Sequence, residues 1–305
     1  MAMLKDTVLH LAQQHRVKEF VSTNTATRRV VRRFVAGETL AEALDVTRKL
    51  NARHISATLD HLGENVSDST EASSAARVYR DILDRIAEAR LDASISIKLT
   101  ALGLDVDRDL CRANLESVLQ AAAERDIFVR VDMEGSSYTQ ATIAIVQEMR
   151  AQYDVVGTVI QSMLYRSEKD VEELIATKTR VRLVKGAYLE PPPVAYQRKA
   201  DVDAQFVKLA HALLDRGNYP AIATHDQEII EDVRRYAADH DIPRSRFEFQ
   251  MLYGIRRDLQ ERLAREGYNV RIYVPYGTQW YPYLTRRMAE RPANLVFVLS
   301  NAFRG

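Results

Sequence analysis

The residues best suited to binding a small ligand lie in the segment YPYLTRRMAERP (281–292). On a helix, this spacing places Tyr283, Arg287 and Glu290 near one face, with Arg286 beside them. Two adjacent guanidinium groups offer planar pairs of donors to one carboxylate. The tyrosine ring can pack on the apolar part of the same ligand, and Glu290 can hold an arginine in place. The segment therefore predicts a carboxylate-binding helix; a solvated arginine pair is the alternative.

Further polar residues follow short apolar runs, close to the point where each run ends. In chain order they are Asp60, Lys98, Asp132, Glu134, Gln161, Arg182, Lys185, Thr224, His225, Gln250 and Tyr273. A buried charge costs several kcal/mol unless it is paired, so packing alone does not account for this placement. Any one of these residues fits a structural ion pair equally well. Their shared position at the ends of the runs favours a functional site.

Two lysines allow a different chemistry. Lys98 or Lys185 could form a Schiff base at a strand end, as the lysines of barrel aldolases do. The alternative for Lys98 is an ion pair with a neighbouring carboxylate such as Asp132. In KGAY (185–188) the small residues let a ligand approach the backbone closely, although an ordinary turn has the same composition. His225 has no second ligand at metal-binding spacing, which favours a hydrogen-bonding histidine.

Composition and motifs exclude several classes of protein. Lys and Arg number 43 against 42 Asp and Glu, and this net charge of +1 argues against a broadly basic nucleic-acid surface. The single cysteine, Cys111, excludes an internal disulfide framework and a multi-cysteine zinc site, and fits a reducing compartment. It begins a predicted helix and is interpreted as a small packing residue. Nothing matches a Rossmann glycine motif, a phosphate-binding loop or a nucleophile elbow.

The chain also lacks the patterns of membrane insertion. No run approaches the roughly 18 consecutive apolar residues of a spanning helix. Residues 1–16 read as an amphipathic helix, without the apolar run and cleavage site of a signal peptide. We therefore expect a cytoplasmic protein. The N-terminal helix or RRVVRR (28–33) could contact the inner face of the plasma membrane; a solvated helix face is the alternative.

The elements that must position these residues alternate along the chain. Apolar, β-branched runs occupy 54–62, 94–99, 127–133, 155–161, 181–186, 221–226, 247–252 and 270–275. Amphipathic segments lie between them, such as 75–90, 111–125 and 201–216. This alternation predicts a closed (β/α)8 barrel with its chemistry at the carboxyl ends of the strands; an open doubly wound sheet is the alternative. Thr39 is a candidate cap for a helix over 37–50, and PPP (191–193) reads as a local turn.

The ordered motifs resemble those of the proline dehydrogenase family, in particular its short, monofunctional bacterial members. The resemblance runs from about residue 37 to the end of the sequence and extends to the proline dehydrogenase domain of bifunctional proline utilization A. Its anchors are LNARHISATLDHLGENV (50–66), SIKLTALGLD (96–105), VDMEG (131–135), RLVKGAYLE (182–190), ATHD (223–226), FEFQMLYG (247–254), RIYVPYG (271–277) and YLTRRMAER (283–291).

The resemblance implies an α/β fold, a distorted TIM-type (β/α)8 barrel with extra N-terminal helices. We expect residues 1–45 to form a helical segment packed on the barrel, and residues 46–305 to form the catalytic barrel that binds FAD. The implied enzyme needs no metal and oxidises L-proline to Δ1-pyrroline-5-carboxylate by hydride transfer to FAD. A membrane quinone reoxidises the flavin. The reaction is the first step of proline catabolism to glutamate, with pyrroline-5-carboxylate dehydrogenase as a separate protein.

The resemblance also assigns residues to roles. It implies as catalytic residues Lys98, Asp132, Arg182, Tyr273, Arg286 and Arg287. It implies as substrate-binding residues Lys98, Leu252, Tyr273, Tyr283, Arg286 and Arg287, with Glu64 as a gate that pairs with an arginine. It implies as cofactor-binding residues Asp132, Gln161, Arg182, Lys185, Gly186, Ala187, Tyr188, Thr224, His225, Gln250 and Glu290. Arg182 is expected near flavin N5.

Some positions depart from the family pattern. Many relatives carry glycine at the position of His54, some carry an aromatic residue at Leu189, and asparagine is frequent at Asp226. No residue stands out as a general base, so we expect bulk water to accept the proton of the substrate amine. A barrel that binds FAD or an amino acid without turnover is the alternative, and the intact set of charged residues favours an enzyme.

Overall fold

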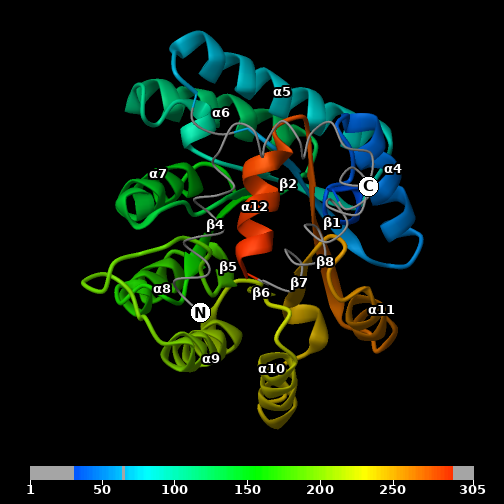
Figure 1. Ribbon diagram of the computed structural model, residues 1–305, viewed down its shortest axis with the longest axis vertical. Coiled ribbons are helices and arrows are strands. Elements are labelled where there is room, and N and C mark those ends of the chain that lie inside the picture. Colours follow the sequence, from blue (N-terminus) through cyan, green and yellow to red (C-terminus); the bar gives the residue numbers. More distant parts are fainter. Residues whose placement is uncertain (1–30, 64–65, 291–305) are drawn as a thin grey trace, which may run out of the picture.

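The computed structural model describes residues 31–63 and 66–290, with the side chains of residues 286–290 outside that description. A ring of helices surrounds a central set of strands, and one helix lies across the middle of the view (Figure 1). The expected helix over residues 1–16 lies outside the described residues, as does the first half of RRVVRR, residues 28–30.

The strands form one closed parallel barrel in sequence order. They are β1 (Ser56–His61), β2 (Ala93–Ile97), β3 (Val129–Val131), β4 (Val156–Gln161), β5 (Arg180–Val184), β6 (Ala221–Ala223), β7 (Glu248–Leu252) and β8 (Asn269–Tyr276). Each matches one of the eight apolar runs. Strand β1 pairs with β8 in parallel from Ser56↔Arg271 to His61↔Tyr276, which closes the sheet. The predicted barrel is confirmed, and the open doubly wound sheet is excluded.

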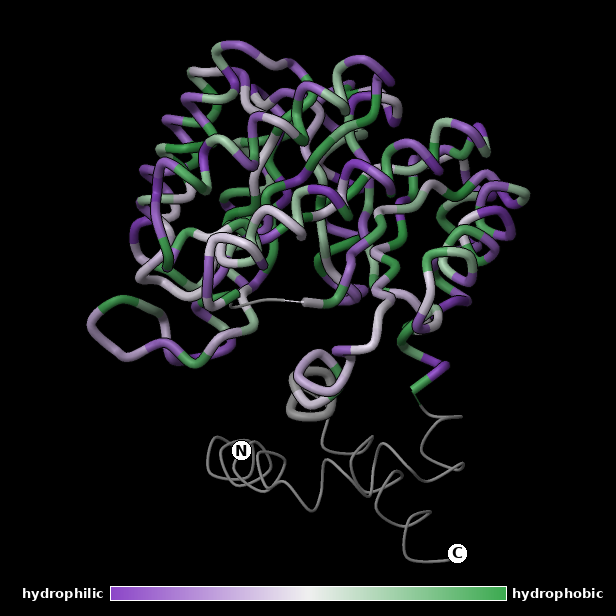
Figure 2. The backbone as a smooth tube through the Cα atoms, turned by 90° about the horizontal axis from the view of Figure 1, so that it is seen from above, coloured by the Kyte–Doolittle hydropathy of each residue, from purple (hydrophilic) through white to green (hydrophobic). Residues whose placement is uncertain are grey.

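Helices follow the strands around the barrel. They are α4 (Leu40–Asn51), α5 (Ser69–Glu88), α6 (Arg108–Glu124), α7 (Thr139–Arg150), α8 (Ser167–Ala176), α9 (Lys199–Arg216), α10 (Gln227–Asp239), α11 (Arg257–Arg265) and α12 (Trp280–Glu290). Short 3-10 turns lie at η1 (Thr100–Leu102), η2 (Ser136–Tyr138) and η3 (Arg244–Arg246). Along these helices the tube in Figure 2 alternates between hydrophobic and hydrophilic residues, as amphipathic helices do.

Thr39 caps α4 as expected. Its hydroxyl accepts a hydrogen bond from the Glu42 backbone, and the Glu42 carboxylate accepts one from the Thr39 backbone. This reciprocal capping box satisfies two donors that the first helical turn cannot satisfy itself. Helix α4 crosses the proposed boundary at residue 45, and the division into two parts stays a prediction.

The two faces of the strands differ in chemistry. On β2, Ile95 and Ile97 are buried apolar residues, while Ser94 and Ser96 alternate with them. Alternate residues of a strand point to opposite faces. Arg182 on β5 reaches Ser96 with a hydrogen bond, so the polar face points into the barrel. The apolar face therefore packs against the helices, and the interior of the barrel is lined by polar and charged side chains.

Helix α12 packs on a segment that precedes the barrel. An apolar cluster joins Val31, Phe34, Val35, Leu62, Trp280, Tyr281, Tyr283 and Leu284. Backbone hydrogen bonds fix the same segment to the end of β8, from Ala36 N–H to Pro275 O (2.8 Å) and from Gly277 N–H to Gly37 O (3.0 Å). Within the described ranges, no helix is long and apolar enough to cross a membrane.

Candidate active site

Asp132 is the centre of a hydrogen-bonded network inside the barrel. It directly follows β3, and its Oδ1 accepts from Arg182 Nη1 (2.8 Å) and Ser96 Oγ (2.9 Å). The phenol of Tyr273, on β8, donates to Asp132 Oδ2 (2.7 Å). Residues from β2, β3, β5 and β8 thus converge on one carboxylate, as the closed barrel requires. The structure brings together three of the expected catalytic residues, Asp132, Arg182 and Tyr273.

Lys98 lies between two carboxylates. Its Nζ is 3.3 Å from Asp60 Oδ1 and 4.0 Å from Asp132 Oδ2. The Lys98 side chain is 9% exposed and that of Asp60 is 1% exposed, so the Lys98–Asp60 pair is buried. The expected carboxylate neighbour, Asp132, is present, but Asp60 is closer. The geometry is that of an ion-paired lysine, which disfavours the Schiff-base alternative.

Asp60 is a site residue that the sequence marked only as the end of a strand. Burial raises the pKa of its carboxyl above the ordinary value, and the nearby Lys98 ammonium opposes this rise. Its register opposite Ser96 on β2 places it beside the Asp132 network. The sequence signal for this role is a carboxylate near the end of the first apolar run, a position that it shares with the other polar residues at the run ends.

Arg182 uses most of its donors inside the protein. Nε donates to Gln250 Oε1 (2.5 Å), and Nη1 donates to Ser96 and Asp132. The guanidinium carbon also lies 5.2 Å from the centre of the Tyr273 ring. Among the described residues, the buried Nη2 has no hydrogen-bond partner. A buried donor without a partner is costly, so this atom favours a bound group that accepts a hydrogen bond there.

Tyr273 stays a neutral donor over the working pH range. Burial raises the pKa of its phenol well above the ordinary value, and the negative charges of Asp132 and Asp60 add to the effect. The phenol therefore keeps the proton that it shares with Asp132.

Lys185 forms a second charged cluster, beyond the end of β5. Its Nζ is 2.6 Å from Asp203 Oδ1 and 2.8 Å from Asp226 Oδ2. Burial raises the pKa of Asp226, but Lys185 and Lys199 outweigh it and the net shift is downward. Asp226 also caps α10 through the Glu228 backbone. The Lys185 ammonium is therefore held by carboxylates, which disfavours a Schiff-base lysine here too.

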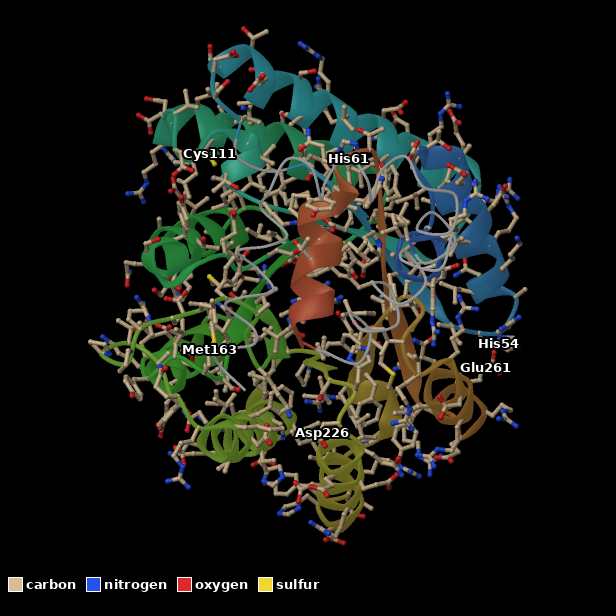
Figure 3. The ribbon with its side chains drawn as sticks, viewed as in Figure 1. His54, His61, Cys111, Met163, Asp226 and Glu261 are labelled. Carbon is tan, nitrogen blue, oxygen red and sulfur yellow. The ribbon has the colours of Figure 1, made fainter. Side chains whose placement is uncertain are left out.

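The glycine after Lys185 is required by its surroundings. Gly186 has φ +118°, and a Cβ there would lie 2.3 Å from Met163 Sδ. The backbone of this loop therefore packs directly against Met163, while Asp226 lies at the beginning of α10 (Figure 3). Ala187 and Tyr188 follow in the same loop and are half-buried, whereas Leu189 is exposed.

A hydrogen bond of His225 connects the segment after β6 to the end of β7. Its Nε2 accepts a hydrogen bond from the Leu252 backbone N–H (2.9 Å). Thr224 Oγ1 accepts from the Asp226 backbone (3.1 Å). The hydrogen-bonding interpretation of His225 is therefore consistent with the geometry. The described residues contain no group of three His, Cys, Asp or Glu side chains that could hold a metal ion.

Gln161 and Glu134 connect the loops after β3 and β4. Gln161 Nε2 donates to the Glu134 backbone oxygen (2.9 Å). The Glu134 carboxylate accepts from the Thr100 backbone (3.2 Å) and hydroxyl (2.7 Å). Gln161 thus has an internal partner for its amide nitrogen, and its cofactor role stays a prediction.

The helix predicted around Tyr283 is present as α12, and its carboxylate-binding role stays a prediction. Its residue Tyr283 is 6% exposed within the apolar cluster that joins α12 to residues 31–35. The helix backbone carries Arg286, Arg287 and Glu290, whose side chains lie outside the described residues, as does Glu64.

Comparison with known proteins gives a single family. The sequence model of the family described as "Proline dehydrogenase" matches residues 43–300. Proline dehydrogenase 1 of Bacillus subtilis subsp. natto is 42% identical over 99% of this chain and 100% of its own length. Proline dehydrogenase of Deinococcus radiodurans is 42% identical over 90% of each chain.

A solved structure with the same barrel belongs to a longer protein. Proline utilization A from Bdellovibrio bacteriovorus, inactivated by N-propargylglycine, superimposes with a TM-score of 0.81 at 28% identity. The match covers 87% of this chain and 33% of that one, so the chain spans about a third of the solved protein.

Proposed function

The chain belongs to the proline dehydrogenase family, and we propose that it oxidises L-proline to Δ1-pyrroline-5-carboxylate with FAD as hydride acceptor. The structural observation that supports this proposal, in addition to family membership, is the Asp132 network. Within it, Arg182 keeps one buried donor without a partner among the described residues. That donor suits a hydrogen-bond acceptor on a flavin ring.

The residues present fit FAD. When bound, FAD supplies the two-electron redox chemistry that no side chain can supply. Arg182 would donate to it from Nη2, and the loop of Lys185 and Gly186 would approach it through the backbone. The remaining expected contacts are Asp132, Gln161, Ala187, Tyr188, Thr224, His225, Gln250 and Glu290.

The substrate is held by charge at one end and by apolar contact at the other. Arg286 and Arg287 on α12 bind the carboxylate, and Lys98 adds positive charge. Tyr273, Tyr283 and Leu252 form the wall against the ring, and Glu64 acts as the gate. Fixing the carboxylate also fixes the position of the ring carbon that loses hydride, and such positioning is worth several kcal/mol of barrier.

No side chain needs to act as a general base. Asp132 is the nearest candidate, but both its oxygens accept hydrogen bonds, from Arg182, Ser96 and Tyr273. Both carboxylate oxygens are therefore already used within the network, and neither is left over as an obvious acceptor for the substrate proton. Positive charge from Lys98 and the two arginines lowers the pKa of the bound amine. Bulk water then accepts its proton.

The wider setting follows from the same proposal. A membrane quinone reoxidises the flavin, which places the protein in the cytoplasm with transient contact at the inner face of the plasma membrane. A separate pyrroline-5-carboxylate dehydrogenase takes the product onward to glutamate.

An anaerobic absorbance spectrum tests the proposal. The purified protein, loaded with FAD, should lose its visible flavin bands when L-proline is added and regain them with a soluble quinone. Flavin bands that persist with L-proline would contradict the substrate. A protein that cannot be loaded with FAD would contradict the cofactor.

A second reagent tests the same site independently. The solved relative was inactivated by N-propargylglycine. This compound carries an amine and a carboxylate as proline does, so we expect it to inactivate the loaded protein over time. Excess L-proline should protect, and equal inactivation with and without proline would contradict binding at one site.

A further inference from the structure

We propose that Glu248 and Arg271, deep in the barrel, are positioning residues that set the orientation of Arg182 through Gln250. The proposal rests on the proposed function, since it concerns the donor that Arg182 offers to the flavin. Neither Glu248 nor Arg271 is among the residues to which the family pattern assigned a role.

A continuous chain of contacts supports the proposal. Arg182 Nε donates to Gln250 Oε1 (2.5 Å), and Gln250 Nε2 donates to Glu248 Oε1. Arg271 Nε lies 3.2 Å and 3.0 Å from the two Glu248 oxygens and donates to them. Glu248 and Gln250 are 3% and 4% exposed, so water does not replace these contacts.

Arg271 is itself fixed to the strand that closes the barrel. Its Nη1 donates to the Ala57 backbone oxygen on β1 (2.9 Å). Tyr219 adds a longer hydrogen bond to Glu248 Oε2 (3.4 Å). Burial raises the pKa of Glu248, but Arg271, Gln250 and Arg130 outweigh it, and the net shift is downward. Glu248 therefore stays ionised at neutral pH.

The ionised carboxylate determines which way the Gln250 amide points. A carboxylate accepts hydrogen bonds and cannot donate them, so it requires the NH2 group of Gln250 to face it. The amide oxygen then faces Arg182 Nε. With Nε satisfied by Gln250 and Nη1 by Asp132 and Ser96, the guanidinium plane is fixed and Nη2 remains for the flavin.

Glu248→Gln should reverse this arrangement. Arg271 requires an acceptor, so the new amide would present its oxygen to Arg271 and its NH2 to Gln250. Gln250 would then turn its oxygen toward residue 248 and its NH2 toward Arg182. Two donors would face each other, and Arg182 would be displaced.

The flavin midpoint potential distinguishes positioning from simple charge. Removing a negative charge from the barrel, by itself, makes the flavin easier to reduce and raises the potential. Displacing the Arg182 cation from the flavin makes reduction harder and lowers the potential. The two accounts of Glu248 therefore predict opposite signs.

The experiment measures the potential of FAD-loaded wild type, Glu248→Gln and Gln250→Leu, together with the FAD dissociation constant. We expect both variants to shift the potential to more negative values and to bind FAD more weakly. An unchanged or more positive potential in Glu248→Gln would overturn the proposal. Gln250→Leu, which changes no charge, keeps the proposal testable if Glu248→Gln does not fold.

The double variant tests whether Glu248 acts through Gln250. Without the amide there is nothing for Glu248 to orient, so Glu248→Gln should add no further negative shift in the Gln250→Leu background. A full additive negative shift would contradict the relay.

Asp170→Asn is the matched control. Asp170, on the outer helix α8, is a buried carboxylate, 2% exposed, that pairs with Arg166 at the beginning of that helix; among the described residues, none of its contacts reaches Arg182. It should leave the potential unchanged. Failure of the proposed function would appear differently, because the wild-type flavin would then not be reduced by L-proline.

Discussion

At the scale of single residues, the site is organised around carboxylates that hold cations in place. Asp132 fixes Arg182 and Tyr273, and Asp60 lies beside Lys98. Removing one partner of such a buried pair leaves the other charge uncompensated, which is why these positions tolerate little change. Two predictions test the chemistry at this scale.

Asp132→Asn tests the absence of a general base. The amide disrupts the contacts to Arg182 and Tyr273, so we expect kcat/KM to fall by about tenfold or more. The pKa of the acidic limb of the pH–rate profile should stay the same, because that limb belongs to the substrate amine. Steady-state rates across pH measure both quantities. A shifted or missing acidic limb would show that Asp132 accepts the proton.

Arg287→Met tests the carboxylate contact on α12. We expect the KM for L-proline to rise at least about tenfold, with FAD retained, because a charge in the closed site loses its partner. Arg287→Lys should recover only part of the loss, since lysine lacks the planar pair of donors. Steady-state kinetics with a flavin-content assay measures both. An unchanged KM in Arg287→Met would contradict the assignment.

At the scale of elements, the strands supply apolar residues to the helices and, except for the all-apolar β6, polar residues to the interior. Backbone conformation matters in the turns that precede the strands, at the opposite end of the barrel from Asp60, Lys98 and Asp132. His54 is an example, since it lies just before β1 with φ +57°. Glycine adopts this left-handed conformation more readily than histidine does.

His54→Gly should stabilise the protein. A left-handed L-residue costs about 1–2 kcal/mol, and the extra chain entropy of glycine returns about 0.5–1 kcal/mol, leaving a gain of roughly 0.5–1 kcal/mol. Urea unfolding measures the difference, and activity should not change. Ala52→Gly is the control in the same turn, because Ala52 has φ −61° and gains no relief. Equal effects of the two substitutions would refute the backbone explanation.

At the scale of the whole molecule, the two ends of the described chain meet and close the barrel. Strand β1 pairs with β8, and residues 31–37 are fixed to β8 and α12 by backbone bonds and apolar packing. Gly254 permits this approach, since a Cβ there would lie 1.7 Å from the Arg33 backbone oxygen. Helix α12, which carries Arg286 and Arg287, is therefore held in place by residues from the beginning of the described chain.

Cys111 can be used to test whether the main hydrophobic core, to which it belongs, stays closed to solvent. It is fully buried on α6, its Sγ lies 3.5 Å from Leu99 O, and burial raises its pKa to about 12. The pKa of this thiol is higher in the folded protein than in the unfolded chain, where it is about 8.5. Its contribution to the free energy of unfolding is therefore fully present below about pH 8.5 and is lost as the pH rises toward the folded value. We expect no reaction with an aromatic disulfide at pH of about 8 in native buffer, and one thiol per chain in denaturing urea. Rapid labelling of the native protein would contradict a closed core.

The sequence by itself determined the order of the elements and the types of residue at the strand ends. Eight apolar runs became eight strands, and the segment around Tyr283 became α12, because local periodicity fixes which residues share a face. The family was identified from the same motifs, and the comparisons confirm it. The types of residue at the strand ends were visible for the same reason.

The tertiary structure alone decided which of those residues touch. Lys98 meets Asp60 across 38 positions in the chain, and Arg182 meets Gln250 across 68. Such contacts depend on strand register and on closure of the barrel, which spacing along the chain does not encode. The direction of the Gln250 amide depends further on Glu248, two positions earlier on the same strand, and on Arg271 of β8, which only the folded barrel brings to Glu248.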